Sequence, residues 1–263
     1  MASFDIMHAT RQGYFHFWAG RHVLVRLAMI PLFLKIISYF VVLSLGLEGN
    51  ILRQGLILLP ATLLEGYMVC LFLRLATFSH EPMEKPYGSA AEVYYKIRAR
   101  DIQAGAVIYT LLKLFSTFVV GIIMGMGEPS EEFQTSFLAF LLIIGLLVGM
   151  IWAVRIAWIY IPVVLGYSVK EYLHRVRGFS FSFHALSVWI MCLLPPLLAT
   201  IVLSDILGLI TGHTAESPSQ IFRYMIVMFQ SVIELAIVII STVAVGNGIY
   251  QLMSGQADKS DKA

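Results

Sequence analysis

The chain has 263 residues, of which 59% are hydrophobic and 13% are charged, and its mean hydropathy is +0.82. Soluble domains carry roughly 25% charged residues, so this composition excludes an ordinary water-soluble fold. The apolar runs are continuous and long enough to cross a bilayer as helices, whereas a membrane β-barrel would alternate in short strands. The sequence therefore predicts an all-α polytopic membrane protein.

Six membrane-spanning helices are predicted in chain order. They cover residues 23–46, 54–78, 102–126, 136–166, 184–211 and 220–252. Residues 1–22 are interpreted as a cytoplasmic or interfacial segment, because this stretch lacks the features of a cleaved signal peptide. The helices are expected to form one transmembrane domain of three tandem hairpins. The hairpins cover 23–78, 102–166 and 184–252, with cytoplasmic loops at 79–101 and 167–183 and a tail at 253–263.

The distribution of basic residues predicts the orientation of the helices. Alternate connecting segments hold eleven of them: Arg11, Arg21, Lys85, Lys96, Arg98, Arg100, Lys170, Arg175, Arg177, Lys259 and Lys262. The other segments, with the first turn of the sixth helix included, hold only Arg53 and Arg223. Cytoplasmic loops are enriched in Lys and Arg, so both termini are expected in the cytoplasm. A bacterial inner membrane is the expected location.

Aromatic residues mark the cytoplasmic start of each odd-numbered helix, at 14–18, 93–95 and 179–183. An anchoring belt in the headgroup layer is the simplest interpretation. The alternative is that basic and aromatic residues together bind anionic lipid headgroups. The residues expected to do so are Arg11, Trp18, Arg21, Lys96, Arg98, Arg100, Arg175 and Arg177. The first of these segments is also expected to lie on the membrane surface as a short helix, which Gly13 interrupts.

Short similarities within the sequence predict a threefold pseudo-repeat of about 80 residues. KIISYFVV at 35–42 resembles KLFSTFVV at 113–120, one such interval later. RLATF at 74–78, RIAWI at 155–159 and ELAIV at 234–238 recur at nearly the same interval. Three parallel hairpins, related by an axis along the membrane normal, would explain this spacing.

Three charged residues are expected at the middle of the bilayer. Lys35 and Lys113 both lie about 18–20 Å past the polar flanks of their helices, at 1.5 Å per residue. Glu65 reaches the same depth from the opposite side. A lone charge there costs roughly 3 kcal/mol on insertion scales, and an ion pair lowers that cost. Lys35, Glu65 and Lys113 are therefore predicted to form a buried polar layer.

A second charged layer is predicted from the longer repeat. If the repeats pack around one axis, Arg74, Arg155 and Glu234 stand at comparable heights, and Glu234 bridges the two arginines. Arg74 lies close to the end of its span, so snorkelling toward the headgroups is the alternative. Ion pairs that hold the helices in register are the simpler interpretation of both layers. A proton or ion path is the functional alternative.

Prolines and glycines suggest two further features. Pro195 and Pro196 predict a break in the fifth helix, which with Asp205 marks a candidate ion path, although a plain kink is the simpler outcome. Two small-residue pairs would let the second hairpin pack closely. They are Gly121 with Gly125 and Gly145 with Gly149.

The sequence carries no phosphate-binding loop, zinc-protease motif or serine-hydrolase elbow. Cys70 and Cys192 lie in apolar runs, which argues against a disulfide framework or a zinc site. No enzyme activity, cofactor, metal or nucleic acid is expected. The leading hypothesis is a non-catalytic membrane protein that works by binding lipids, a partner membrane protein or a second copy of itself, as an accessory or assembly subunit or a scaffold. The alternative is a secondary transporter or channel for a proton, ion or small solute.

Overall fold

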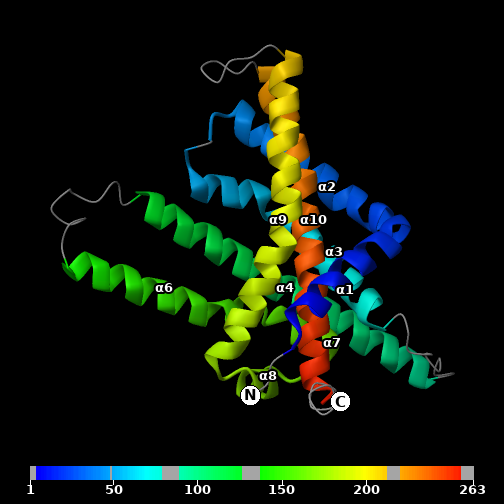
Figure 1. Ribbon diagram of the computed structural model, residues 1–263. Coiled ribbons are helices and arrows are strands. Elements are labelled where there is room, and N and C mark those ends of the chain that lie inside the picture. The colour runs from blue at the N-terminus through cyan, green and yellow to red at the C-terminus, as the bar shows by residue number, and fades with distance from the viewer. Residues whose placement is uncertain (1–3, 48, 79–88, 126–136, 212–219, 256–263) are drawn as a thin grey trace.

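The computed structural model describes residues 4–47, 49–78, 89–125, 137–211 and 220–255, and all its regular secondary structure in these ranges is helical (Figure 1). The helices are α1 (Ile6–Ala19), α2 (Arg21–Ser44), α3 (Ile51–Phe78), α4 (Ser89–Gly125), α6 (Phe137–Ala157), α7 (Tyr160–Leu165), α8 (Val169–Arg175), α9 (Phe179–Thr211) and α10 (Gln220–Met253).

Six helical segments of this described part are long and apolar enough to cross a membrane, which confirms the predicted class. They are Arg21–Ser44, Ile51–Phe78, Ala99–Ile122, Val148–Leu165, Phe179–Ile206 and Phe222–Met253. The chain is thus a helical membrane protein.

The fourth predicted helix, at 136–166, is not continuous. α6 ends at Ala157 and α7 begins at Tyr160 after a short turn. Pro162 explains the interruption, because proline has no N–H to donate to the carbonyl of Trp158 one turn earlier. The N–H of Ile161 donates to that carbonyl at 3.0 Å instead, which tightens the first turn of α7.

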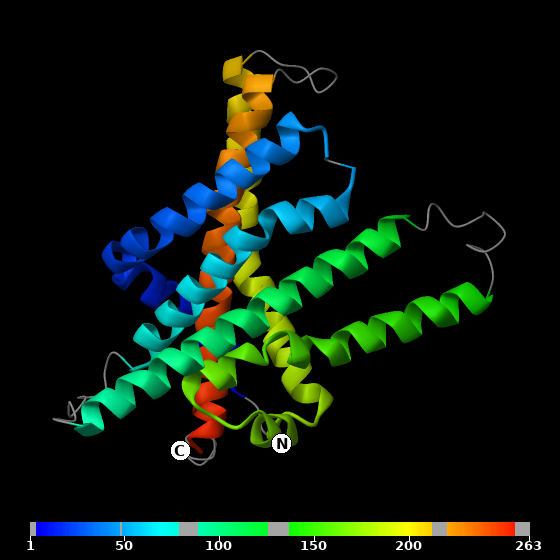
Figure 2. The same ribbon diagram turned by 180° about the vertical axis from the view of Figure 1, so that it is seen from behind.

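α10 is the central helix, and the other helices are arranged around it (Figures 1 and 2). It packs against α1, α2, α3, α7 and α9. α3 lies between α2 and α4, and α4 also packs against α7. α6 packs against α9. α4 therefore packs mainly against α3 and α7, and α6 packs mainly against α9, rather than against each other. A Cβ added at Gly145 or Gly149 would meet no other group within 4 Å, so this glycine pair makes no close helix contact in the described structure.

A well-buried part of the core surrounds the second half of α10. Tyr172 of α8, Phe181 of α9 and Ile161 of α7 are completely buried there together with Ile239 and Ile249 of α10. This end of the bundle gathers α1, α7 and α8 around α10, as Figure 1 shows. The opposite ends of the helices are more exposed.

α1 is continuous through Gly13 and packs against α10 and α9, so the predicted interruption is wrong. A Cβ at Gly13 would lie 2.7 Å from the carbonyl oxygen of Ile240 and 2.8 Å from the Cβ of Ala244. A Cβ at Gly248 would similarly lie 2.6 Å from the ring of Phe4. These glycines therefore permit close helix contact, and α1 is part of the bundle rather than a separate surface helix.

α9 runs without a break through Pro195 and Pro196, so the predicted helix break is wrong. Pro196 has no N–H to donate to the carbonyl of Cys192 one turn earlier. The hydroxyl of Tyr14, from α1, donates to that carbonyl at 3.0 Å. A partner from a neighbouring helix therefore satisfies the group that the proline leaves free. Asp205 is exposed further along α9.

Candidate functional site

Two lysines and two glutamates meet inside the bundle. The Nζ atom of Lys35 lies 3.0 Å from Oε2 of Glu65 and 3.0 Å from Oε2 of Glu234. The Nζ atom of Lys113 lies 2.6 Å from Oε1 of Glu65 and 3.0 Å from Oε1 of Glu234. Each lysine contacts both glutamates, so the four groups form a closed ring of alternating charge. We call these four residues the charge ring.

The charge ring joins four helices, since α2, α3, α4 and α10 contribute one residue each. Its geometry depends on close packing between α3 and α4. A Cβ added at Gly66 would lie 2.7 Å from the ring of Tyr109 and 3.0 Å from the carbonyl oxygen of Ala106. This glycine brings the two backbones together, so that the Lys113 side chain reaches Glu65.

Hydroxyl groups complete the hydrogen bonding of the two glutamates unequally. Tyr109 donates to Oε1 of Glu65. Tyr39 lies near Glu234, but its hydroxyl is 3.5 Å from Oε2, which is long for such a bond. Glu65 is therefore held by three short contacts, whereas Glu234 has two short contacts and one long one.

The ring is also buried unequally. The side chains of Lys35 and Glu65 are 3% and 1% exposed, whereas those of Lys113 and Glu234 are 28% and 33% exposed. Two positive and two negative charges cancel, which lowers the cost of placing them between apolar helices. One half of the charge ring is therefore enclosed, and the other half reaches the surface of the protein.

The structure brings together the three residues predicted to form a polar layer, and it adds Glu234 to them. The expectation that Glu234 bridges Arg74 and Arg155 is wrong. Glu234 contacts Lys113 of α4, whereas Arg74 contacts Asp101, which lies nearer the start of the same helix. At 1.5 Å per residue these two contacts are separated by about 18 Å along α4.

Arg74 holds the end of a neighbouring helix rather than snorkelling. Its Nη1 atom donates to the carbonyl oxygen of Val164 in the last turn of α7 at 2.9 Å, and lies 3.5 Å from Oδ2 of Asp101. Cationic side chains stabilise the free carbonyls at helix C-termini in this way. Arg74 therefore fixes α7 to α3 and α4.

Two more arginines bind backbone carbonyls at the ends of helices. Nη1 of Arg155 lies 3.4 Å and 3.2 Å from the carbonyl oxygens of Val176 and Arg177, just after α8. Nη1 of Arg175 donates to the carbonyls of Leu252 and Met253 in the last turn of α10 at 2.8 Å and 3.1 Å. Arg155 and Arg175 thus serve the packing of this end of the bundle.

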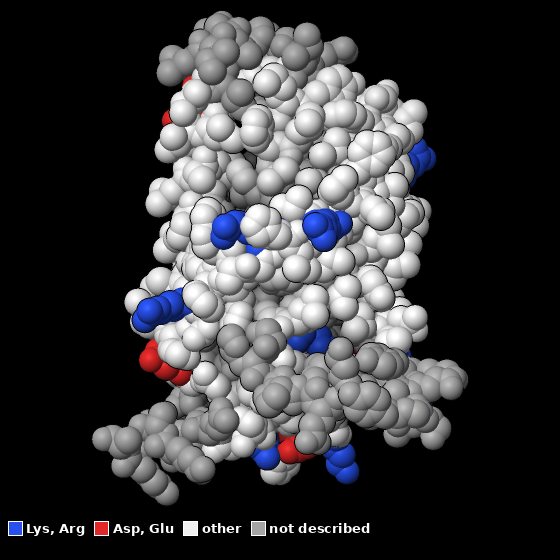
Figure 3. All heavy atoms as spheres, turned by 90° about the vertical axis from the view of Figure 1, so that its right-hand side faces the viewer, with Lys and Arg blue, Asp and Glu red and all other residues white. Residues whose placement is uncertain are grey.

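The residues that were predicted to bind lipid headgroups are mostly exposed where the structure describes them. Arg11 and Arg21 are exposed, and Trp18 is 67% exposed. The guanidinium of Arg21 lies 5.1 Å from the Trp18 ring centroid and donates to the Trp18 carbonyl at 3.2 Å. Figure 3 shows Lys and Arg side chains about halfway up the side of the molecule that it views, which is otherwise mostly uncharged. Two others, Arg100 and Arg177, are exposed, and the side chains of Lys96 and Arg98 lie outside the described part of the structure.

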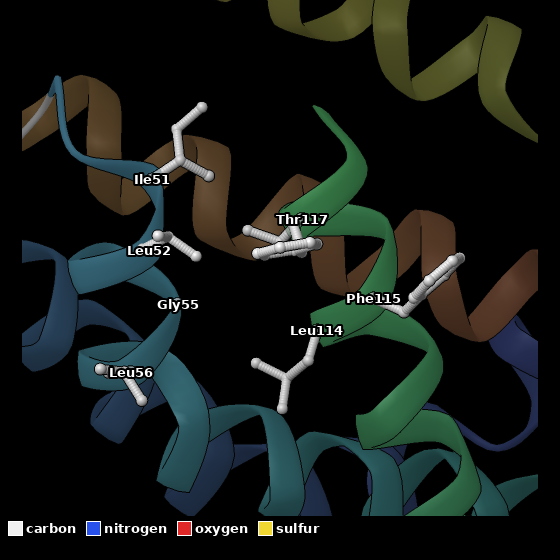
Figure 4. Close-up of a pocket in the computed structure, with 8 residues that line it drawn as sticks. Ile51, Leu52, Gly55, Leu56, Leu114, Phe115 and Thr117 are labelled. Atoms are coloured by element: carbon white, nitrogen blue, oxygen red, sulfur yellow. The ribbon is translucent and has the colours of Figure 1, made fainter. Parts of the chain in front are cut away.

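An apolar cavity of about 440 Å³ lies between α3 and α4 (Figure 4). It is lined by residues that precede Glu65 in α3 and follow Lys113 in α4. Its lining residues are Ile51, Leu52, Gly55, Leu56, Leu114, Phe115, Thr117 and Phe118. The cavity does not include the four ring residues. Among the described residues, no cluster of three or more His, Cys, Asp or Glu side chains forms a metal site.

Sequence reasoning missed two residues of this site, Tyr39 and Tyr109. Tyr39 comes one helical turn after Lys35, and Tyr109 comes one turn before Lys113. Residues one turn apart share one face of a helix. A search for polar side chains one turn from each buried lysine would have found both tyrosines.

No protein-family model matches the chain, and neither a curated protein nor a solved structure is significantly similar to it.

Proposed function

We propose that the chain is a non-catalytic integral membrane protein that works by binding, either as an assembly subunit of a partner membrane protein or as a lipid-contacting scaffold. The observation that supports this proposal is the closure of the charge ring. Each lysine neutralises both glutamates, so the ring ties α2, α3, α4 and α10 together without an unpaired charge. Buried ion pairs of this kind fix the register between helices.

Anionic phospholipid is the binding partner that the surface favours. Arg11 and Arg21 are exposed on a face that also presents the aromatic side chains of Phe15 and Trp18. Arginine binds phosphate oxygens, and exposed tryptophan favours the headgroup layer. The junction between α1 and α2 is therefore the proposed headgroup site.

The proposed orientation has both termini in the cytoplasm of a bacterial cell, with the protein in the inner membrane. The excess of basic residues in alternate connecting segments supports it. The proposed threefold repeat is supported by Lys35 and Lys113, which begin the two similar stretches of sequence and have the same two partners in the charge ring.

Native mass spectrometry of protein released from nanodiscs tests the binding function. The nanodiscs contain equal amounts of an anionic and a zwitterionic phospholipid. We expect wild-type protein to retain mainly the anionic lipid, and the double variant Arg11→Gln/Arg21→Gln to retain less. The Asp205→Asn variant, altered at an exposed carboxylate of α9, is the control. A wild-type protein that is strictly monomeric and retains neither lipid would contradict the proposal.

A second function, transport of a proton, ion or small solute, is favoured by the exposure of Lys113 and Glu234. Charged groups within a membrane usually face a bundle interior or a water-filled opening. Flux across proteoliposomes distinguishes this function from the first. A proton or anion flux that Lys113→Met abolishes would support transport, and wild-type vesicles as tight as empty ones would exclude it.

A further inference from the structure

The exposed half of the charge ring contains one carboxylate that is suited to exchange. Glu65 is almost fully buried and accepts contacts from two lysines and Tyr109. Glu234 is one-third exposed, and its third contact, with Tyr39, is long. Of the two carboxylates, Glu234 is therefore the one more open to exchange with a competing anion.

An interrupted polar stripe, with Ile226 and Val227 between Arg223 and Gln230, leads along α10 to this exposed half. Arg223, Gln230 and Glu234 lie on one face of α10, because steps of two turns and then one turn return to the same side of a helix. Arg223 and Gln230 are both exposed. On α4, the exposed hydroxyl of Ser116 lies one turn from Lys113 in the same direction.

Gln230 and Glu234 lie inside the membrane-spanning segment Phe222–Met253, where acyl chains solvate polar groups poorly, whereas Arg223 lies at the start of that segment. Exposed polar side chains at such depth are expected to line a water-filled opening. The stripe begins at Arg223, so its charge would attract anions rather than cations. Glu234, one turn after Gln230, contacts the ammonium group of Lys113, which is the cation that an anion would meet at the end of the stripe.

We propose that the charge ring binds a monovalent carboxylate, which takes the place of Glu234 on Lys113 and Lys35 while Glu234 accepts a proton. Two lysines and Glu65 carry one net positive charge once Glu234 is neutral. One bound carboxylate restores neutrality, so the exchange leaves no unpaired charge in the membrane.

The proton that Glu234 accepts comes from one of two sources, and the net change is the same in both cases. A ligand that enters as the neutral acid transfers its own proton to Glu234, so that one O–H bond breaks and another forms. A ligand that enters as the anion is accompanied by a proton from water. The transfer between two carboxyl groups is close to balanced, since their ordinary acidities are similar.

The ionisable groups that face Glu234 come from three helices. They are Lys35 and Tyr39 of α2, Glu65 of α3 and Lys113 of α4. α1, α7 and α9 also pack against α10, but the described charge contacts of Glu234 are with the two lysines. Protonation of Glu234 therefore acts directly on the anion site. The binding step holds under either proposed function, and only movement of the anion depends on transport.

Infrared difference spectroscopy in nanodiscs of zwitterionic lipid tests the exchange. The probes are acetate, which is water-soluble, and dodecanoate, which partitions into the bilayer, both labelled with ¹³C at the carboxyl carbon. This label separates their bands from those of the protein. Binding should produce the band of a protonated glutamate in wild-type protein, and this band should be missing in Glu234→Gln. Acetamide and methyl dodecanoate, which have no acid group, are the control ligands.

Affinity measurements with the same probes separate an anion site from a purely structural ring. At pH 7, Glu234→Gln should bind the carboxylate at least about tenfold more tightly than wild type and lose the pH dependence, because no proton has to be taken up. Wild-type affinity for the anion should rise by up to about tenfold for each unit that the pH falls. Lys113→Met should weaken binding by at least about tenfold, and Asp205→Asn should not change it.

Each outcome decides the inference. Binding of acetate assigns the site to soluble carboxylates, and binding of dodecanoate alone assigns it to acids dissolved in the bilayer. Wild-type protein that binds neither acid overturns the inference, as does equal binding by wild type and Lys113→Met. If Lys113→Met fails to fold, the gain in affinity of Glu234→Gln remains the deciding measurement, and unchanged affinity overturns the inference. Binding without flux would exclude transport and leave the anion site standing.

Discussion

Among single residues, Glu65 shows that the stability of a buried charge depends on all of its partners. Its carboxylate is 1% exposed and receives contacts from two ammonium groups and one hydroxyl. Removing a single partner leaves a buried charge partly uncompensated, which is more costly than losing the same contact at a surface.

The two tyrosines beside the charge ring give a matched comparison. Tyr109→Phe removes a hydrogen bond to a buried carboxylate and should lower the free energy of unfolding by about 1–2 kcal/mol. Tyr39→Phe removes only the 3.5 Å contact with Glu234 and should change stability by less than about 0.5 kcal/mol. Equilibrium unfolding in a mild detergent measures both changes. Equal effects of the two variants would contradict the description of the ring.

The depth of a charged residue along its helix could be predicted from the sequence, whereas the residues that it contacts on neighbouring helices could not. Counting residues from the polar flanks placed Lys35, Glu65 and Lys113 at one level. The predicted level of Glu234 depends on the repeat instead of on this count. The count from Gln220, where α10 begins, gives a depth of about 21 Å, which is mid-bilayer. The same physical rule would have placed Glu234 with the lysines.

At the scale of the elements, contacts between distant segments explain what local sequence rules predicted wrongly. Pro196 predicts a break by its missing N–H, and Gly13 predicts an interruption by its flexibility. α1 resolves both cases. Tyr14, far away in the sequence, supplies a donor to the carbonyl freed by Pro196, and Gly13 permits contact with α10. Such partners are not visible in any short stretch of sequence.

The role of Tyr14 predicts a coupling with Pro196. Tyr14→Phe should cost about 1 kcal/mol in the wild-type background, because the carbonyl of Cys192 then has no donor. Pro196→Ala restores a backbone N–H to that carbonyl, so Tyr14→Phe should cost much less in that background. A double-mutant cycle of unfolding free energies measures the difference. Additive effects would show that the hydroxyl does not replace the missing N–H.

Two glycines predict opposite responses to the same substitution. Gly13→Ala places a methyl group 2.7 Å from the backbone oxygen of Ile240 and should destabilise the protein by about 1–3 kcal/mol. Gly149→Ala meets no group within 4 Å and should be neutral or stabilising by up to about 1 kcal/mol. Thermal unfolding in detergent compares the two variants. A tolerant Gly13 would argue against close contact between α1 and α10.

At the scale of the whole molecule, the class and the six apolar helices could be predicted from composition and the length of the apolar runs. These features depend on the bilayer and not on particular neighbours. The arrangement around α10 could not be predicted, because apolar helices in lipid carry little information about which partner they choose. The capping of helix ends by Arg74, Arg155 and Arg175 was missed for the same reason.

The proposed topology is tested by single cysteines placed in the connecting segments. Substitutions at Pro129 and Pro218 should react with an impermeant thiol reagent added outside intact cells, and those at Gly88 and Gly178 should react only after the cells are opened. The first two positions and Gly88 lie outside the described residues. External labelling of Gly88→Cys would overturn the orientation and the six-span topology.

The charge ring is expected to couple the four helices that contribute to it. Unfolding free energies for Glu65→Gln, Lys113→Met and the double variant measure this coupling, with Asp205→Asn as a control expected within about 0.5 kcal/mol of wild type. Each single variant leaves one unbalanced charge and should lose about 1–3 kcal/mol. The double variant leaves Lys35 and Glu234 as a neutral pair, so its loss should be clearly smaller than the sum of the two single losses. Strictly additive losses would contradict the existence of a coupled charge ring.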